Sequence, residues 1–146
     1  MKSFRLETLL KLRNALRRGQ QAQLAACQQA LAKTQVTRRE VAAQLDQARQ
    51  QQAITTSTGR LSGTQLRANH QFIQDLQEQQ QRLKTQENEL LQQLQAQRER
   101  YNHADGEAKA LENLRKRQAV GDARISARLE TRELDQVAQR TSGHIA

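Results

Sequence analysis

Residues 73–111, IQDLQEQQQRLKTQENELLQQLQAQRERYNHADGEAKAL, decide the fold. Within this stretch, apolar or tolerated polar residues recur at alternating spacings of three and four. The series is Ile73, Leu76, Gln80, Leu83, Glu87, Leu90, Leu94, Gln97, Tyr101, Ala104, Ala108 and Leu111. A period near 3.5 that is sustained over so many turns predicts a helix in a coiled coil, because disorder would not keep the phase.

A second series of the same period precedes it. Its members are Leu24, Cys27, Leu31, Thr34, Arg38, Val41, Leu45 and Ala48. Further upstream, Leu9, Leu12 and Leu16 form a stripe that is offset by one residue from this register, with Gly19 near the change. We expect a local discontinuity of the heptad there.

The two series are separated by residues 54–64, ITTSTGRLSGT, which gather β-branched, Ser and Gly residues that favour turns and helix caps. We therefore predict an all-α fold in which two long helices form an antiparallel coiled-coil hairpin and a single domain over 1–146. The expected boundaries are a helix over about 3–54, a turn over about 55–63 and a helix over about 64–139, with Ser62 or Thr64 as the cap. The longer second helix leaves apolar residues without an internal partner: Val120, Ile125, Leu129, Leu134 and Val137.

No group of residues in the sequence supports catalysis or a bound cofactor. No phosphate-binding glycine loop is present, and Cys27 has no nearby His and falls on the apolar series. His103 and Glu107 stand one turn apart beside Asp105, but a solvated helix face explains them better than a metal site. We expect a protein that is not an enzyme, with no metal and no cofactor. A single Cys fits a reducing compartment. No apolar run is long enough to span a membrane, and the N-terminus lacks the apolar region of a secretory signal.

The formal net charge of +9 is concentrated in the first 60 residues, which hold 11 basic and 3 acidic residues. Such an excess favours an acidic protein surface, a nucleic acid or an anionic membrane. With one Tyr, two Phe and no Trp, the chain lacks the aromatic residues on which single-stranded nucleic acid stacks. We expect no nucleic-acid partner and no membrane insertion.

Three segments resemble a known family, the FliJ family of flagellar export proteins, whose relatives include the stalk proteins of virulence type III secretion. They are FRLETLLKLR at 4–13, QFIQDL at 71–76 and RLETRELDQVAQR at 128–140. The last departs from the family pattern where Glu133-Leu134-Asp135 replaces an adjacent acidic pair. The motifs do not distinguish a flagellar from a virulence system.

The resemblance implies a central stalk and general chaperone of the export apparatus. Such a protein inserts into a hexameric export ATPase, links it to the cytoplasmic domain of the export-gate membrane protein and helps recycle export chaperones. It would be cytoplasmic and peripheral to the inner membrane, at the base of the apparatus. Two alternatives stay open: a coiled-coil scaffold without an ATPase partner, and a basic helical protein associated with nucleic acid.

An antiparallel hairpin is expected to bring both chain ends together as the ATPase contact. The residues expected in it are Arg5, Leu6, Leu9, Leu10, Arg13, Arg17, Arg128, Leu129, Arg132, Leu134 and Arg140. The resemblance also places the export-gate contact at Phe72 and Leu76, which stand one helical turn apart and are expected to form one apolar patch.

Overall fold

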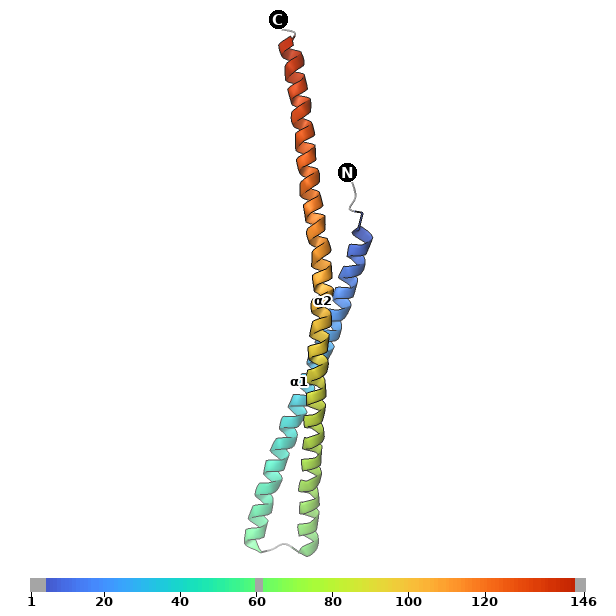
Figure 1. Cartoon of the computed structure of the whole chain (residues 1–146). Helices are drawn as coiled ribbons and strands as arrows, with labels where there is room; N and C mark the ends of the chain where they lie inside the picture. The colour runs from blue at the N-terminus through green and yellow to red at the C-terminus, as the bar shows by residue number, and fades with distance from the viewer. Residues whose placement is uncertain (1–4, 60–61, 144–146) are drawn as a thin grey trace. The chain divides into compact units, whose positions relative to one another are not determined.

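The computed structural model describes residues 5–59 and 62–143, and these residues fold into two helices (Figure 1). Helix α1 spans Glu7–Thr58 and helix α2 spans Gly63–Gly143. They run antiparallel and pack against each other, with no strand in the described ranges, which confirms the predicted hairpin. The contacts divide into two units, residues 19–101 and residues 1–18 with 102–146. The prediction of one domain stays a prediction.

The unit of residues 19–101 has the apolar core of the fold. Val41 and Leu45 of α1 pack against Ile73 and Leu76 of α2, and Ala48 and Leu83 flank this cluster. All the members of both predicted heptad series in this unit are buried or half-buried. The sequence therefore predicted this seam correctly, including its polar positions.

Three of those polar positions, Gln97, Arg38 and Glu87, are satisfied by contacts across the seam. Gln97 is 5% exposed, and its Nε2 donates to the main-chain oxygen of Gln20 at 3.2 Å and to Gln20 Oε1 at 2.6 Å. Arg38 Nη1 donates to Glu87 Oε2 at 2.5 Å. That hydrogen bond, assisted by Gln35, lowers the pKa of Glu87 against the opposing effect of burial. Buried polar groups with matched partners favour one register over others.

The end of α1 differs from the expectation of a turn that begins at residue 55. The helix continues through Thr58 because the hydroxyls of its last turn bond back to main-chain carbonyls. Thr55 Oγ1 donates to Gln51 O at 2.6 Å, Thr56 Oγ1 to Gln52 O at 2.7 Å and Thr58 Oγ1 to Thr55 O at 3.0 Å. Hydroxyl side chains can satisfy such bonds inside a helix as well as outside it, so a run of Thr and Ser is compatible with a helical end.

Capping residues then end α1 and start α2. Gly59 adopts a φ of 67°, the left-handed conformation that commonly terminates a helix, and its N–H donates to Thr56 O at 3.3 Å. Ser62 and Gln65 form a reciprocal capping box. Gln65 N donates to Ser62 Oγ at 3.2 Å, and Ser62 N donates to Gln65 Oε1 at 3.3 Å. The predicted cap at Ser62 is confirmed, and α2 ends at Gly143, four residues beyond the predicted end at 139.

The unit formed by residues 1–18 and 102–146 corrects the prediction of a heptad discontinuity. Leu10 is 2% exposed and faces α2, whereas Leu12 and Leu16 are 54% and 45% exposed. The inward positions in this segment are Leu10, Arg13 and Arg17, which continue the register of the downstream series. The predicted start of the helix near residue 3 lies outside the described residues, and α1 begins at Glu7.

Candidate interaction surfaces

Ion pairs hold the first turns of α1 against α2. Arg13 Nη1 contacts Glu107 Oε2, and Arg17 reaches both Asp105 at 3.4 Å and Glu112 at 3.2 Å. Arg115 Nη1 lies 3.5 Å from Glu7 Oε1. Apolar contact in this segment rests on few groups, chiefly Leu10 and the fully buried Ala108. Charge therefore contributes a larger part of the packing here than it does around Val41 and Leu45.

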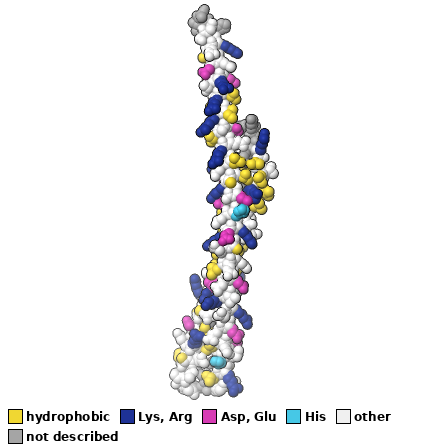
Figure 2. All heavy atoms as spheres, viewed as in Figure 1, with side chains coloured by type: hydrophobic (Ala, Val, Ile, Leu, Met, Phe, Trp, Pro, Cys, Tyr) yellow, Lys and Arg dark blue, Asp and Glu magenta, His cyan; other side chains and the backbone are white. Residues whose placement is uncertain are grey.

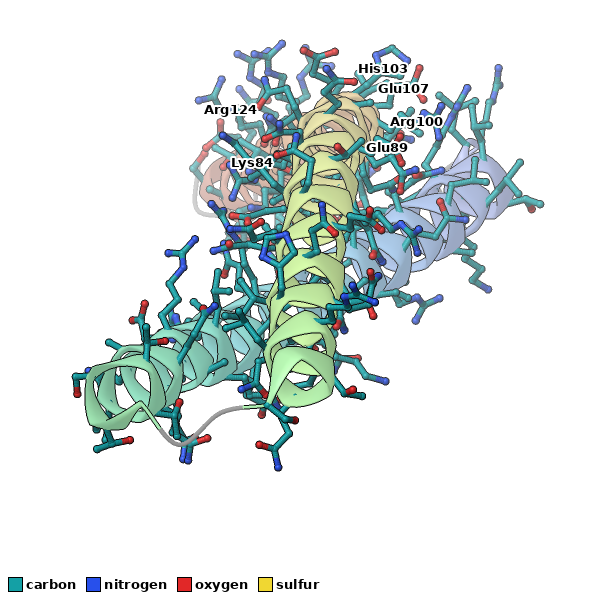
Figure 3. The ribbon with its side chains drawn as sticks, turned by 90° about the horizontal axis from the view of Figure 1, so that it is seen from below. Lys84, Glu89, Arg100, His103, Glu107 and Arg124 are labelled. Atoms are coloured by element: carbon teal, nitrogen blue, oxygen red, sulfur yellow. The ribbon has the colours of Figure 1, made fainter. Side chains whose placement is uncertain are left out.

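The acidic side of this network is tied to α2 as well as to α1. Lys109 Nζ lies 2.9 Å from Asp105 Oδ2, and this contact, together with Arg17, lowers the pKa of Asp105 although burial opposes it. His103 Nε2 lies 3.0 Å from Glu107 Oε1, and Figure 3 shows both residues on the same side of α2, with Arg124 on another side. These carboxylates are bound by cations, so they act as structural partners of α1.

The structure does not bring all the predicted ATPase residues to one place. Glu7 lies level with Arg115, and Arg17 lies level with residues 105–112, so the first turns of α1 do not reach the α2 turns that carry Arg128, Leu129, Arg132, Leu134 and Arg140. The expectation that both sets share one end is wrong for this reason. Leu10, Arg13 and Arg17 face α2 in its seam, while Arg5 and Leu6 are exposed and Leu9 is half-exposed.

The last turns of α2 have no packing partner in the described chain. Every residue from 123 to 143 is exposed. The exposed apolar side chains include Ile125 at 57%, Leu129 at 53% and Leu134 at 69%. The exposed apolar series runs from Ile125 to Val137, about three turns of helix, and exposed apolar surface of this kind marks protein contact sites in general.

Phe72 and Leu76 do not form one exposed patch. Phe72 is 54% exposed, but Leu76 is 5% exposed and belongs to the core cluster with Val41, Leu45 and Ile73. The expectation of a joint patch is therefore wrong. Leu76 lies on the heptad seam, whereas Phe72 comes one position before the seam residue Ile73. Phe72 instead borders a groove of about 530 Å³ between the ends of the two helices, whose other lining residues include Ile54, Thr55, Gln65 and Asn69.

Sequence reasoning missed the partners of the basic N-terminal turns. Asp105 and Glu107 were expected to be a solvated face, and Arg13 and Arg17 to be free for a partner protein. The signal was present in the sequence as an excess of basic residues in the first turns of α1 and the acidic residues of 105–112 that pair with Arg13 and Arg17. It required the pairing of the helices, which local pattern does not supply.

The comparison with family models gives a match to the flagellar FliJ protein over residues 1–144. The chain belongs to the FliJ family. No curated protein and no solved structure matches it. FliJ proteins are a non-enzymatic family of the flagellar export system, so the chain has a role related to flagellar export.

In residues 5–59 and 62–143, no three His, Cys, Asp or Glu side chains come together in a way that would hold a metal ion. Neither described helix contains a segment long and apolar enough to cross a membrane. Cys27 is a free thiol that is half-buried on the seam, where the heptad placed it.

Proposed function

We propose that this FliJ family member is the central stalk of the flagellar export ATPase and that it links the ATPase ring to the export gate. The observation that carries the proposal is the bare C-terminal part of α2, where residues 123–143 are all exposed and still carry an apolar series. A hexameric ring that surrounds this segment would cover it. In that position the chain is cytoplasmic and peripheral to the inner membrane.

The ATPase contact consists first of Arg128, Leu129, Arg132, Leu134 and Arg140. The apolar side chains provide the buried contact, and the arginines set orientation and encounter rate against acidic pore loops. Arg5 and Leu6, which precede α1, and Leu9 of α1 add a second contact at their own level. Leu10, Arg13 and Arg17 act indirectly, by holding the first turns of α1 on α2.

Truncation after residue 127 tests the ATPase contact. The shortened chain keeps every described interhelical ion pair and the core cluster, so it should fold but fail to stimulate ATP hydrolysis by the hexamer. The double variant Leu129→Gln/Leu134→Gln should reduce stimulation, whereas Leu91→Gln, an exposed leucine on α2 within residues 19–101, should not. Full stimulation by the truncated chain at saturating concentration would refute this contact.

The export-gate contact is Phe72 together with the groove that it borders. Leu76 supports this surface from within the core and makes no direct contact in this proposal. Phe72→Ala should weaken binding of the purified cytoplasmic gate domain while helicity by circular dichroism stays unchanged. Gate binding that survives Phe72→Ala would remove Phe72 from this role.

Export chaperones are further proposed partners of the same protein. The scaffold and nucleic-acid alternatives make opposite predictions in the same assays. A scaffold would leave ATP hydrolysis unchanged, and a nucleic-acid protein would shift DNA in a salt-dependent manner. Stimulation of the ATPase without a DNA shift supports the stalk.

A further inference from the structure

A hollow of about 340 Å³ lies between α1 and α2 in the unit formed by residues 1–18 and 102–146. Its lining residues are Leu10, Asn14, Glu112, Arg115, Lys116 and Ala119. We call this site the α1–α2 hollow. Its volume is near the lower end of ligand pockets. In the proposed function none of its lining residues contacts the ATPase or the export gate.

The first turns of α1 have two flanks of different character. Leu12 and Leu16 are 54% and 45% exposed, and Figure 2 shows hydrophobic side chains gathered over these turns. The other flank carries Lys11, Asn14 and Arg18, which each follow an inward residue by one position. Residues three and four positions apart are neighbours on a helix, so Lys11 and Arg18 lie on either side of Asn14, which lines the hollow.

Three cations border the hollow without a carboxylate partner. Lys116 belongs to the lining, and Lys11 and Arg18 lie on its α1 side. None of the three takes part in an ion pair among the described residues 5–59 and 62–143. Of the described carboxylates that precede residue 129 in this unit, only Asp122 is outside an ion pair. The charge that remains for a ligand here is therefore basic.

The hydrogen-bonding groups of the lining leave a donor unused as well. Asn14 Oδ1 accepts a hydrogen bond from Arg17 Nη2 at 3.0 Å, and Glu112 Oε1 accepts from the same nitrogen at 3.2 Å. The amide nitrogen of Asn14 has no partner within the described part of the chain. Since Arg17 fixes the amide oxygen, Asn14 offers its N–H groups to the hollow beside the ammonium group of Lys116. Such a set of donors suits a carboxylate.

We propose that the α1–α2 hollow binds an acidic segment of a partner protein. A carboxylate of the segment binds Asn14 and Lys116, and an aliphatic side chain beside it packs on Leu10. Lys11 and Arg18 attract the neighbouring carboxylates and set the orientation of the segment.

Two features favour a protein segment over other anionic ligands. Leu10 and Ala119 give the hollow an apolar part, and the phosphate backbone of a nucleic acid would leave that part without a contact. A second copy of the chain has a formal net charge of +9, so it would meet this flank with like charge. The occupant is therefore a segment that carries both carboxylates and an aliphatic side chain.

Binding of a designed peptide to the full chain tests the proposal. The peptide has about 12 residues, mostly Glu with one central Leu, and fluorescence anisotropy follows its binding at low salt, where exposed charges are least screened. Lys11→Gln/Lys116→Gln should weaken binding about tenfold, because each exposed ion pair contributes about threefold. The matched control Lys33→Gln/Lys84→Gln removes one exposed lysine from each helix within residues 19–101, and it should change binding by less than about twofold.

Asn14→Asp tests the hollow itself as distinct from the net charge of the chain. This substitution keeps an oxygen that accepts from Arg17 but replaces the unused amide donor by a second carboxylate oxygen. Binding of the Glu peptide should fall by at least about tenfold, since a donor is lost and a like charge is added. The melting temperature should not fall, because the contact with Arg17 is kept. Asn88→Asp, the same change at an exposed asparagine of α2 within residues 19–101, is the control for charge.

Four results of the peptide assay would overturn the proposal: no binding at about 1 mM peptide, an equal loss in the two lysine pairs, unchanged binding to Asn14→Asp, or equal binding of a peptide with Lys in place of Glu. Tighter binding of a DNA strand of equal charge would assign the flank to nucleic acid. A dimer in sedimentation that Lys11→Gln/Lys116→Gln dissolves would assign it to a second copy. Because the assay contains neither ATPase nor gate domain, its outcome is independent of the stalk proposal.

Discussion

Substitution of Leu76 by Ala separates a core role from a binding role at the segment that resembles the family's gate contact. Leu76 is 5% exposed and packs on Val41, Leu45 and Ile73, whereas Phe72, four residues earlier, is 54% exposed. Leu76→Ala removes three carbon atoms from the core, whereas Phe72→Ala removes a half-exposed ring. We expect Leu76→Ala to destabilise the fold by about 2 to 3 kcal/mol, near the low end for buried leucines, because a cavity in a two-helix seam is easily hydrated or closed.

Phe72→Ala should cost about 0.5 kcal/mol, as is usual for a surface change. At a slope of about 2 kcal/mol per M, the urea midpoint followed by circular dichroism should fall by about 1 M for Leu76→Ala. The midpoint should hardly shift for Phe72→Ala. Leu91→Ala is the matched control, because it makes the same substitution at a leucine of α2 that is 44% exposed. Equal midpoints for the two alanine variants would refute the assignment of Leu76 to the core.

Three further predictions follow from the charges and the turn. The pKa values of Glu87 and Asp105 are lowered by folding, so both carboxylates stabilise the fold above their unfolded pKa values of about 4.5 and 3.8. This contribution is lost as the pH falls through the folded pKa values. Helicity measured at a fixed urea concentration should therefore drop on acidification, and it should drop less in Glu87→Gln. Arg17→Ala should speed hydrogen exchange in residues 7–18 and leave residues 41–48 protected. Because salt screens ion pairs, 1 M NaCl should have the same effect on the wild type. Equal acceleration of exchange in both segments would contradict a local role of Arg17. Gly59→Ala should destabilise the hairpin by about 1 kcal/mol. The cost comes from the positive φ of residue 59 and not from a clash, because a Cβ there meets no neighbouring atom. Unchanged stability in a thermal melt would show that the turn relaxes.

The seam of residues 24–48 against 73–97 was determined by the sequence alone. Leu31, Val41, Leu45, Ile73 and Leu94 recur at heptad spacing and have no competing apolar stripe beside them, so only one face of each helix can be buried. Local chemistry also identified the turn, because Gly59 supplies the left-handed residue and Ser62 the cap. The end of α1 was less certain at this level, since Thr55 and Thr58 satisfy their hydroxyls equally well inside or outside a helix.

Only the tertiary structure decided which face of the first turns of α1 is buried. Leu9, Leu12 and Leu16 form one stripe and Leu10, Arg13 and Arg17 another, and the first is the more apolar by local pattern. The second faces inward, where Arg13 and Arg17 contact carboxylates of 105–112 on α2. A stripe records what a helix can bury, whereas the partner helix and its charges determine what it does bury, and that information lies about 90 residues away in the chain.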